Sequence, residues 1–249
     1  MNVRSSIAWS RRSARGSCLF EREHHRRIET ALLALDADRL LRSACLFGGG
    51  TAISLTHGEF RESVDIDLMT SSRDGYRELR QALTGPLGVG AITRPGHALA
   101  TTRELRADQY GIRTVLDVDG APIKFEIILE GRITFDAPGP ADRVCGIATL
   151  TPLDMLATKL LANADRWADS AVMSRDLIDL AMMKPTRALL KRAIEKARAA
   201  YGDSVERDLA KAIAHLRERP QRLDACMQAM HITGVPKAVL WSRIKALAP

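Results

Sequence analysis

The first half of the chain alternates between helical and strand-like patterns of hydrophobic residues. Apolar positions recur at helical spacing over residues 21–43 and 73–84, and a brief helix is predicted over 52–56. An apolar segment, 44–47, leads into three glycines, and residues 64–69 alternate as a half-buried strand does. This mixture favours an α+β core with a mixed sheet flanked by helices.

A β-hairpin is predicted in the middle of the chain. Residues 113–118 and 123–129 are rich in β-forming side chains, and the residues between them, Asp119-Gly120-Ala121-Pro122, are typical of a turn. Alternation along the second strand places its apolar residues on one face, with Lys124 and Glu126 on the other.

From Thr151 onward the pattern is helical to the last residue. Thr151 and Asp154 resemble a capping box, and Pro152 occupies the first helical position. The sequence therefore predicts three parts: a basic flexible tail over 1–20, a core over 21–150 and an α-helical C-terminal domain over 151–249.

The net charge of +7 is unevenly distributed. Residues 1–20 hold four arginines and no acids, residues 21–183 hold 19 Lys and Arg against 24 acids, and residues 184–249 hold 14 against 6. An acidic middle suits bound cations, and a basic end attracts polyanions such as RNA. A solvated helical surface is the alternative explanation of the basic end.

Composition narrows the class of protein. The four cysteines are far apart and form no C-x-x-C pair, which argues against a zinc ribbon or a disulfide framework and favours reduced thiols in a cytoplasm. No run approaches the roughly 18 apolar residues that a membrane helix needs, so no membrane partner is expected.

Two acids on the strand over 64–69 are the first candidate for chemistry. Asp65 and Asp67 are two residues apart, so both carboxylates point to the same side of a strand. Carboxylates held that close repel each other unless a cation lies between them, and Mg²⁺ suits the arrangement because it also binds phosphate oxygens. Mn²⁺ is the alternative metal.

A glycine-rich turn precedes these acids. Gly48, Gly49 and Gly50 let the backbone approach a ligand closely, and a short helix that begins at Thr51 directs unpaired N–H groups at it. This combination predicts a phosphate-binding turn next to a metal-binding strand.

Glu126 is the predicted third acid, because it lies on the polar face of its strand. Three acids would complete a two-metal site of the kind used in nucleotidyl transfer. Asp117, in the sequence Asp117-Val118-Asp119, is a competing third acid, although Asp119 is typical of a turn before Gly120.

The helix that begins at Pro152 has an apolar stripe with cations along its edge. Lys159 and Arg166 are seven residues apart and project together, where they could offset the charge of a triphosphate. In the next helix Asp176 and Asp179 share a face, and one of them could orient Arg175 or Lys159 rather than touch a metal.

The spacing of these motifs resembles that of known enzymes. A Gly50-Thr51 pair followed by Asp65-Ile66-Asp67 resembles the signature of the polymerase-β nucleotidyltransferase superfamily. More narrowly, the chain is similar to the AbiEii toxin nucleotidyltransferase family over about residues 24–183. The similarity rests on the glycine turn, on Arg61-x-Ser63-x-Asp65, and on a later motif formed by Thr151 to Lys159, Arg166 and Arg175 to Leu180.

The resemblance implies specific roles. Asp65, Asp67 and Glu126 would bind metal, Lys159 would contact the triphosphate and Asp176 would belong to the active-site rim. The nucleotide would also meet the residues Gly49, Gly50, Thr51, Arg61, Arg166 and Arg175. The sequence departs from the superfamily in having Glu as third acid and a long loop between Thr51 and Asp65.

The expected function is therefore that of a toxin in a toxin–antitoxin system, with an antitoxin protein as partner. It would transfer a nucleotide from a nucleoside triphosphate to RNA, foremost the tRNA 3′ end, and so block translation. Two alternatives stay open: an aminoglycoside-type nucleotidyltransferase, whose acceptor pocket would be acidic, and a catalytically inactive nucleic-acid-binding relative.

Overall fold

A mixed β-sheet forms the centre of the first half of the protein. The computed structural model describes residues 19–249. Five strands lie in the order β1-β2-β6-β5-β3, and β4 also pairs with β5. Only β2 and β6 pair in parallel within the described sheet, which confirms the predicted mixed sheet. The strands are β1 Leu46–Gly48, β2 Asp65–Thr70, β3 Ala100–Thr101, β4 Arg106–Ala107, β5 Gly111–Val118 and β6 Ala121–Leu129.

The predicted hairpin is present as β5 and β6, with a tighter turn than expected. Val118 pairs with Ala121, so only Asp119 and Gly120 lie in the turn. Both have positive φ, 52° and 75°, as a two-residue type I′ turn requires. The apolar residues of β6 are buried on one face, and Glu126 lies on the other, as predicted.

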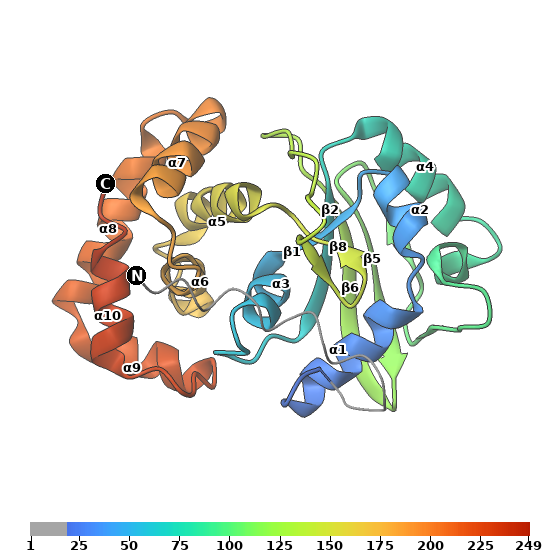
Figure 1. The fold of residues 1–249 in the computed structure, drawn as a ribbon, viewed down its shortest axis with the longest axis horizontal. Coiled ribbons are helices and arrows are strands. Elements are labelled where there is room, and N and C mark those ends of the chain that lie inside the picture. The colour runs from blue at the N-terminus through green and yellow to red at the C-terminus, as the bar shows by residue number, and fades with distance from the viewer. Residues whose placement is uncertain (1–18) are drawn as a thin grey trace, which may run out of the picture.

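Helices cover the apolar face of the sheet, namely α1 Glu23–Ala34, α2 Ala37–Arg42 and α4 Arg73–Leu83, with the 3₁₀ turn η1 Gly88–Ile92 beside them (Figure 1). The single helix predicted over 21–43 was wrong, because the chain breaks at Leu35 and Asp36. The Asp36 side chain accepts a 2.9 Å hydrogen bond from the Arg39 N–H, which starts a new helix.

Two further elements complete this half. Helix α3, Gly49–Thr56, follows β1 directly and is largely buried. A small hairpin of β7 Arg143–Val144 and β8 Ile147–Ala148 precedes the helical half and was not predicted. Its strands are two residues long, too short for a periodic pattern to show.

The second half is helical, as the sequence predicts. Thr151 caps α5 by accepting a 3.2 Å hydrogen bond from the Asp154 N–H. In Figure 1 helices α3, α5 and α6 lie between the sheet and the outer helices α7–α10. The elements are α5 Pro152–Arg166, the 3₁₀ turn η2 Ser170–Val172, α6 Arg175–Met182, α7 Arg187–Tyr201, α8 Ser204–Glu218, α9 Pro220–Ala229 and α10 Lys237–Lys245.

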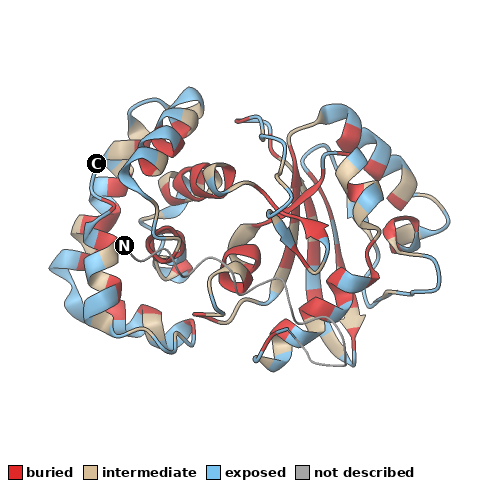
Figure 2. Ribbon diagram, in the orientation of Figure 1, coloured by how far each residue is buried: buried red, intermediate tan, exposed pale blue. Residues whose placement is uncertain are grey.

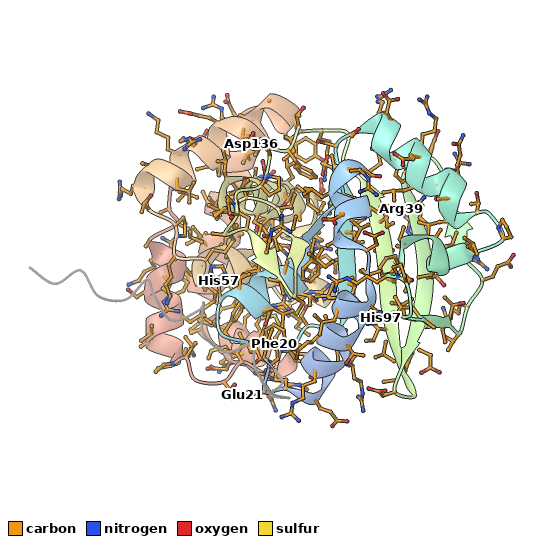
Figure 3. The ribbon with its side chains drawn as sticks, turned by 45° about the vertical axis from the view of Figure 1, so that its right-hand side comes forward. Phe20, Glu21, Arg39, His57, His97 and Asp136 are labelled. Atoms are coloured by element: carbon orange, nitrogen blue, oxygen red, sulfur yellow. The ribbon has the colours of Figure 1, made fainter. Side chains whose placement is uncertain are left out.

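One continuous hydrophobic core extends through both halves, and Figure 2 shows buried residues on strands and helices throughout the fold. Most of the tail predicted over 1–20 lies outside the described residues, but Phe20 belongs to the core and is labelled in Figure 3. Asp136, also labelled there, joins the segment before α5 to α7 through a 3.0 Å ion pair with Lys196.

Two predictions from composition can be compared with the described residues. Cys45, Cys145 and Cys226 are free thiols, and Cys18 lies outside this part of the chain. Over residues 19–249, no helix combines the length and the apolar character needed to cross a membrane.

Candidate active site

Three acids lie on one face of two neighbouring parallel strands. Asp67 of β2 is paired with Glu126 of β6, and Asp65 is paired with Lys124. Paired residues of adjacent strands point to the same side, so the three predicted acids share the face that looks toward α5. Asp117 is paired with Pro122 near the hairpin turn and does not line the cavity described below.

The glycine turn lies directly against Asp67. Gly49 has a φ of +70°, and a Cβ atom built on it would lie 2.2 Å from Oδ2 of Asp67. A Cβ atom on Gly50 would lie 2.1 Å from Nη2 of Arg61. Side chains at these two positions would displace the groups beside them, so the backbone at the start of α3 reaches the acids only because both residues are glycine.

Thr51 does not present its side chain to the site. Its buried hydroxyl donates a 2.8 Å hydrogen bond to Oγ of Ser63 in the loop before β2. The backbone N–H of Thr51 belongs to the first turn of α3, where N–H groups lack helical partners. A contact between Thr51 and a phosphate would therefore be made by the backbone.

A buried ionic network lies behind the acids. Nζ of Lys159 lies 3.0 Å from Oδ1 of Asp176 and 2.8 Å from Oδ2 of Asp179. Arg61 donates to both oxygens of Asp179, at 2.7 and 3.0 Å. Although burial opposes ionisation of Asp179, Arg61 and Lys159 hold its pKa below the ordinary value. All four groups are therefore charged, with their cations fixed in place.

Asp176 also binds Arg166 through two hydrogen bonds, of 2.7 and 2.9 Å. Burial raises the pKa of Asp176, but Lys159 and Arg166 outweigh that effect and lower it. Asp176 lies behind Lys159 and does not line the cavity, so the structure places it as a partner of the cations. Arg175, at the exposed start of α6, does line the cavity.

A cavity of about 330 Å³ brings these elements together. Among the residues predicted from the sequence, it is lined by Gly49, Gly50, Arg61, Asp65, Asp67, Glu126, Lys159, Arg166 and Arg175. Thr51 and Asp176 are the two predicted site residues that do not line it. Asp179, one of the two acids expected to orient Arg175 or Lys159, contacts Lys159 and also Arg61, a partner that the sequence analysis did not predict.

The far end of the cavity holds an ion pair that the sequence analysis missed. Arg132 donates to both carboxylate oxygens of Glu130, at 2.9 and 2.7 Å, and to the Tyr201 hydroxyl at 2.9 Å. It also pairs with Asp165. These residues come from the segment after β6, from α5 and from α7, so no spacing in the sequence points to them.

Two of the three acids are arranged to bind a divalent cation, and the third is held by other residues. Burial, together with the charges of Asp65 and Glu126, raises the pKa of Asp67 to about 6, a cost that a bound cation would relieve. Glu126, however, is held by Arg113 at 3.0 Å and by Lys124 at 3.1 Å. Within residues 19–249, no three potential ligands gather closely enough to hold a metal. Asp65 and Asp67 suit Mg²⁺, and Glu126 would join them after leaving Arg113.

Solved structures similar to this chain include two proteins of Helicobacter pylori. One, described as a "putative nucleotidyltransferase from H. pylori", is 16% identical, with a TM-score of 0.48 over 90% of this chain and 93% of the other. The second, JHP933, is 15% identical, with a TM-score of 0.46 over 89% of each chain. No curated protein matches the chain.

A family model covers most of the sequence. The model described as "Nucleotidyl transferase AbiEii toxin, Type IV TA system" matches residues 31–243. It confirms the resemblance expected over 24–183 from residue 31 onward and extends it toward the C-terminus. This match spans both the sheet and the helical half, and it includes every residue that lines the candidate active site. The chain belongs to the AbiEii family of nucleotidyltransferase toxins.

Proposed function

We propose that this protein is a Mg²⁺-dependent toxin that transfers a nucleoside monophosphate from a nucleoside triphosphate to an RNA acceptor, foremost the 3′ end of tRNA. A cognate antitoxin protein would restrain it. The observation that carries the proposal is that Asp65, Asp67 and Glu126 line one cavity together with the start of α3 and the basic side chains of the cavity.

The residues of the cavity have three different roles in such a reaction. The unpaired N–H groups at the start of α3 bind phosphate oxygens, since a helix N-terminus favours anions. Lys159, Arg166 and Arg175 offset the charge of the triphosphate. Asp65 and Asp67, joined by Glu126, would hold the cation, which lowers the charge on the triphosphate and favours ionisation of the attacking hydroxyl.

The proposed reaction is a displacement at the α-phosphorus of the nucleotide. The acceptor hydroxyl oxygen forms a bond to that phosphorus, and the bond from phosphorus to the bridging oxygen breaks. Pyrophosphate leaves with the electron pair, and the hydroxyl proton passes to a carboxylate of the cavity. No covalent intermediate with the protein is required.

The test uses Asp67→Asn, which removes a negative charge while keeping the shape of the side chain. With Mg²⁺, a labelled nucleoside triphosphate and bulk tRNA, the wild type should label tRNA and the variant should lose at least ~100-fold in rate, on the scale that a single transition-state contact contributes. Because the pKa of Asp67 is raised to about 6, the unfolded state ionises first as pH rises, so ionised Asp67 destabilises the metal-free fold above that pH.

The metal-free variant should therefore unfold at a higher temperature than the metal-free wild type at pH 7 to 8. A stable variant that labels tRNA as well as the wild type would contradict the proposed site. Addition of Mg²⁺ should raise the unfolding temperature of the wild type more than that of Asp67→Asn.

A further inference from the structure

A second and larger cavity, of about 770 Å³, adjoins the candidate active site. It lies beside the hairpin of β5 and β6 and the segment that runs from β3 to β4. Asp65 and Lys124 line both cavities, so the second one opens at the acids themselves. We call it the side groove.

Basic side chains outnumber acids along the side groove. Arg103, Arg106, Arg113 and Lys124 line it, against Asp65 and Glu104. Arg113 and Lys124 are bound to Glu126, and Arg113 is also bound to Asp108. Arg103 and Arg106 are exposed, and neither forms an ion pair with any residue of the described chain. These two guanidinium groups are therefore available for an external anion.

The backbone that carries Arg103 is fixed to the sheet. The Thr102 N–H donates a 2.9 Å hydrogen bond to the carbonyl of Val115, and the Thr114 hydroxyl donates one of 2.8 Å to the carbonyl of Arg103. Arg106 belongs to β4 and is paired with Arg113 of β5. The cations therefore project from an ordered platform, which lowers the entropy lost when a ligand binds.

Many basic residues of the helical domain are, by contrast, already neutralised by neighbours. Ion pairs join Arg198 to Asp203 and Glu206, and further pairs are Lys196–Asp154, Lys211–Asp208 and Lys237–Asp224. Other basic residues of this region, among them Arg192 and Arg217, form no ion pair within the described chain, but none of them lines the side groove or the candidate active site.

Taking the proposed nucleotidyl transfer as its basis, we propose that the side groove binds the RNA acceptor, with its phosphates at Arg103 and Arg106 and its terminal hydroxyl beside Asp65. Polyanionic strands are held by rows of such cations, and a single-stranded end fits an open groove better than a duplex does. The same cations would repel a cationic small molecule such as an aminoglycoside.

The test compares two double variants that remove equal charge. Arg103→Gln with Arg106→Gln alters the side groove, and Arg192→Gln with Arg217→Gln alters exposed positions of α7 and α8. Binding of bulk tRNA is measured without nucleotide over a series of salt concentrations. Transfer to tRNA is then measured with varied tRNA and with varied nucleotide.

The groove variant should bind tRNA about tenfold more weakly, and the slope of log affinity against log salt should shrink by ~0.7 for each lost phosphate contact. Its KM for tRNA should rise, while kcat and the KM for nucleotide stay unchanged. The control variant should match the wild type in all of these measurements.

Three outcomes would contradict the proposal that the side groove binds RNA. They are no tRNA binding by the wild type, an equal loss of tRNA affinity in both variants, or a raised KM for nucleotide in place of a raised KM for tRNA. A failure of the proposed nucleotidyl transfer gives a result that can be distinguished from these three. In that case the wild type binds tRNA in a way that depends on Arg103 and Arg106, but it transfers no nucleotide.

Discussion

Gly49 shows how much of the site depends on a single missing side chain. Its backbone adopts a φ of +70° directly against Asp67. Gly58 has a similar φ of +78°, but a Cβ atom added there would meet no other atom within 4 Å. Gly58 is therefore a matched reference for the backbone effect alone.

Gly49→Ala should abolish nucleotide transfer and should destabilise the fold more than Gly58→Ala does. Both changes carry the roughly 1–2 kcal/mol cost of a side chain in left-handed backbone. Only at Gly49 must the Asp67 carboxylate also move. Thermal unfolding and a transfer assay of both variants check this, and equal behaviour of the two would show that the contact with Asp67 has no effect.

Single residues were predicted best where a short pattern fixes geometry. The i and i+2 spacing was enough to place Asp65 and Asp67 on one face. The partner of Glu126 was missed because a four-residue turn was assumed over 119–122. The observed two-residue turn shifts the register and places Arg113 opposite Glu126.

Helix α6 acts on the candidate site through its buried face. Asp179 is fully buried and holds both Arg61 of the loop before β2 and Lys159 of α5. These contacts determine where both cations lie. Removal of the carboxylate would leave two buried cations without compensation, which costs folding free energy.

Asp179→Asn should cost about 3–5 kcal/mol of folding free energy, because it leaves buried cations without full compensation. It should also weaken binding of nucleoside triphosphate. Asp224→Asn, which disrupts the exposed pair with Lys237, is the control and should cost less than about 1 kcal/mol. Denaturant unfolding and nucleotide titration measure the two effects, and similar costs for both variants would contradict the role of Asp179.

Elements were predicted from periodicity, and the misses have local causes. The helix expected over 21–43 continues its apolar pattern through Leu35, but the side chain of Asp36 competes for backbone N–H groups and starts α2. The ionic network could not be predicted in full, because it joins α5, α6 and a loop far earlier in the chain.

At the scale of the whole molecule, the start of the described chain and the segment between α9 and α10 meet at the loop between α3 and β2. His25 of α1 is buried there, where Nδ1 lies 2.7 Å from Glu59 and Nε2 accepts a 3.1 Å hydrogen bond from the Ser63 N–H. Arg22 donates to the carbonyl of His231, which lies between α9 and α10. The loop that carries Arg61 is therefore held from two sides.

The contribution of His25 to stability should be lost as pH falls below about 6.5, whereas Asp67 acts in the opposite direction in the metal-free protein. Burial, opposed by Glu59, lowers the pKa of His25 from its ordinary value of 6.5, so the unfolded state takes up a proton first. The neutral imidazole contributes stability that is present above pH 6.5 and is lost as pH falls through the folded pKa. Burial lowers the pKa of His57 too, which acts in the same direction.

Denaturant unfolding between pH 7.5 and 5 measures this dependence. His25→Gln should reduce the slope of unfolding free energy against pH, whereas His97→Gln, at an exposed position labelled in Figure 3, should leave it unchanged. An unchanged slope in His25→Gln would contradict the prediction.

The bond between Arg113 and Glu126 joins the two cavities, because Glu126 lines the candidate active site and Arg113 lines the side groove. A Glu126 side chain that turns toward Asp67 gives up Arg113, whose guanidinium then gains capacity for a phosphate. Binding of a nucleotide in the candidate active site should thereby strengthen binding of RNA in the side groove. Thermodynamic reciprocity then requires that bound RNA strengthens binding of the nucleotide by the same factor. An ordered arrival of substrates, donor before acceptor, is the behaviour that such a shared residue favours.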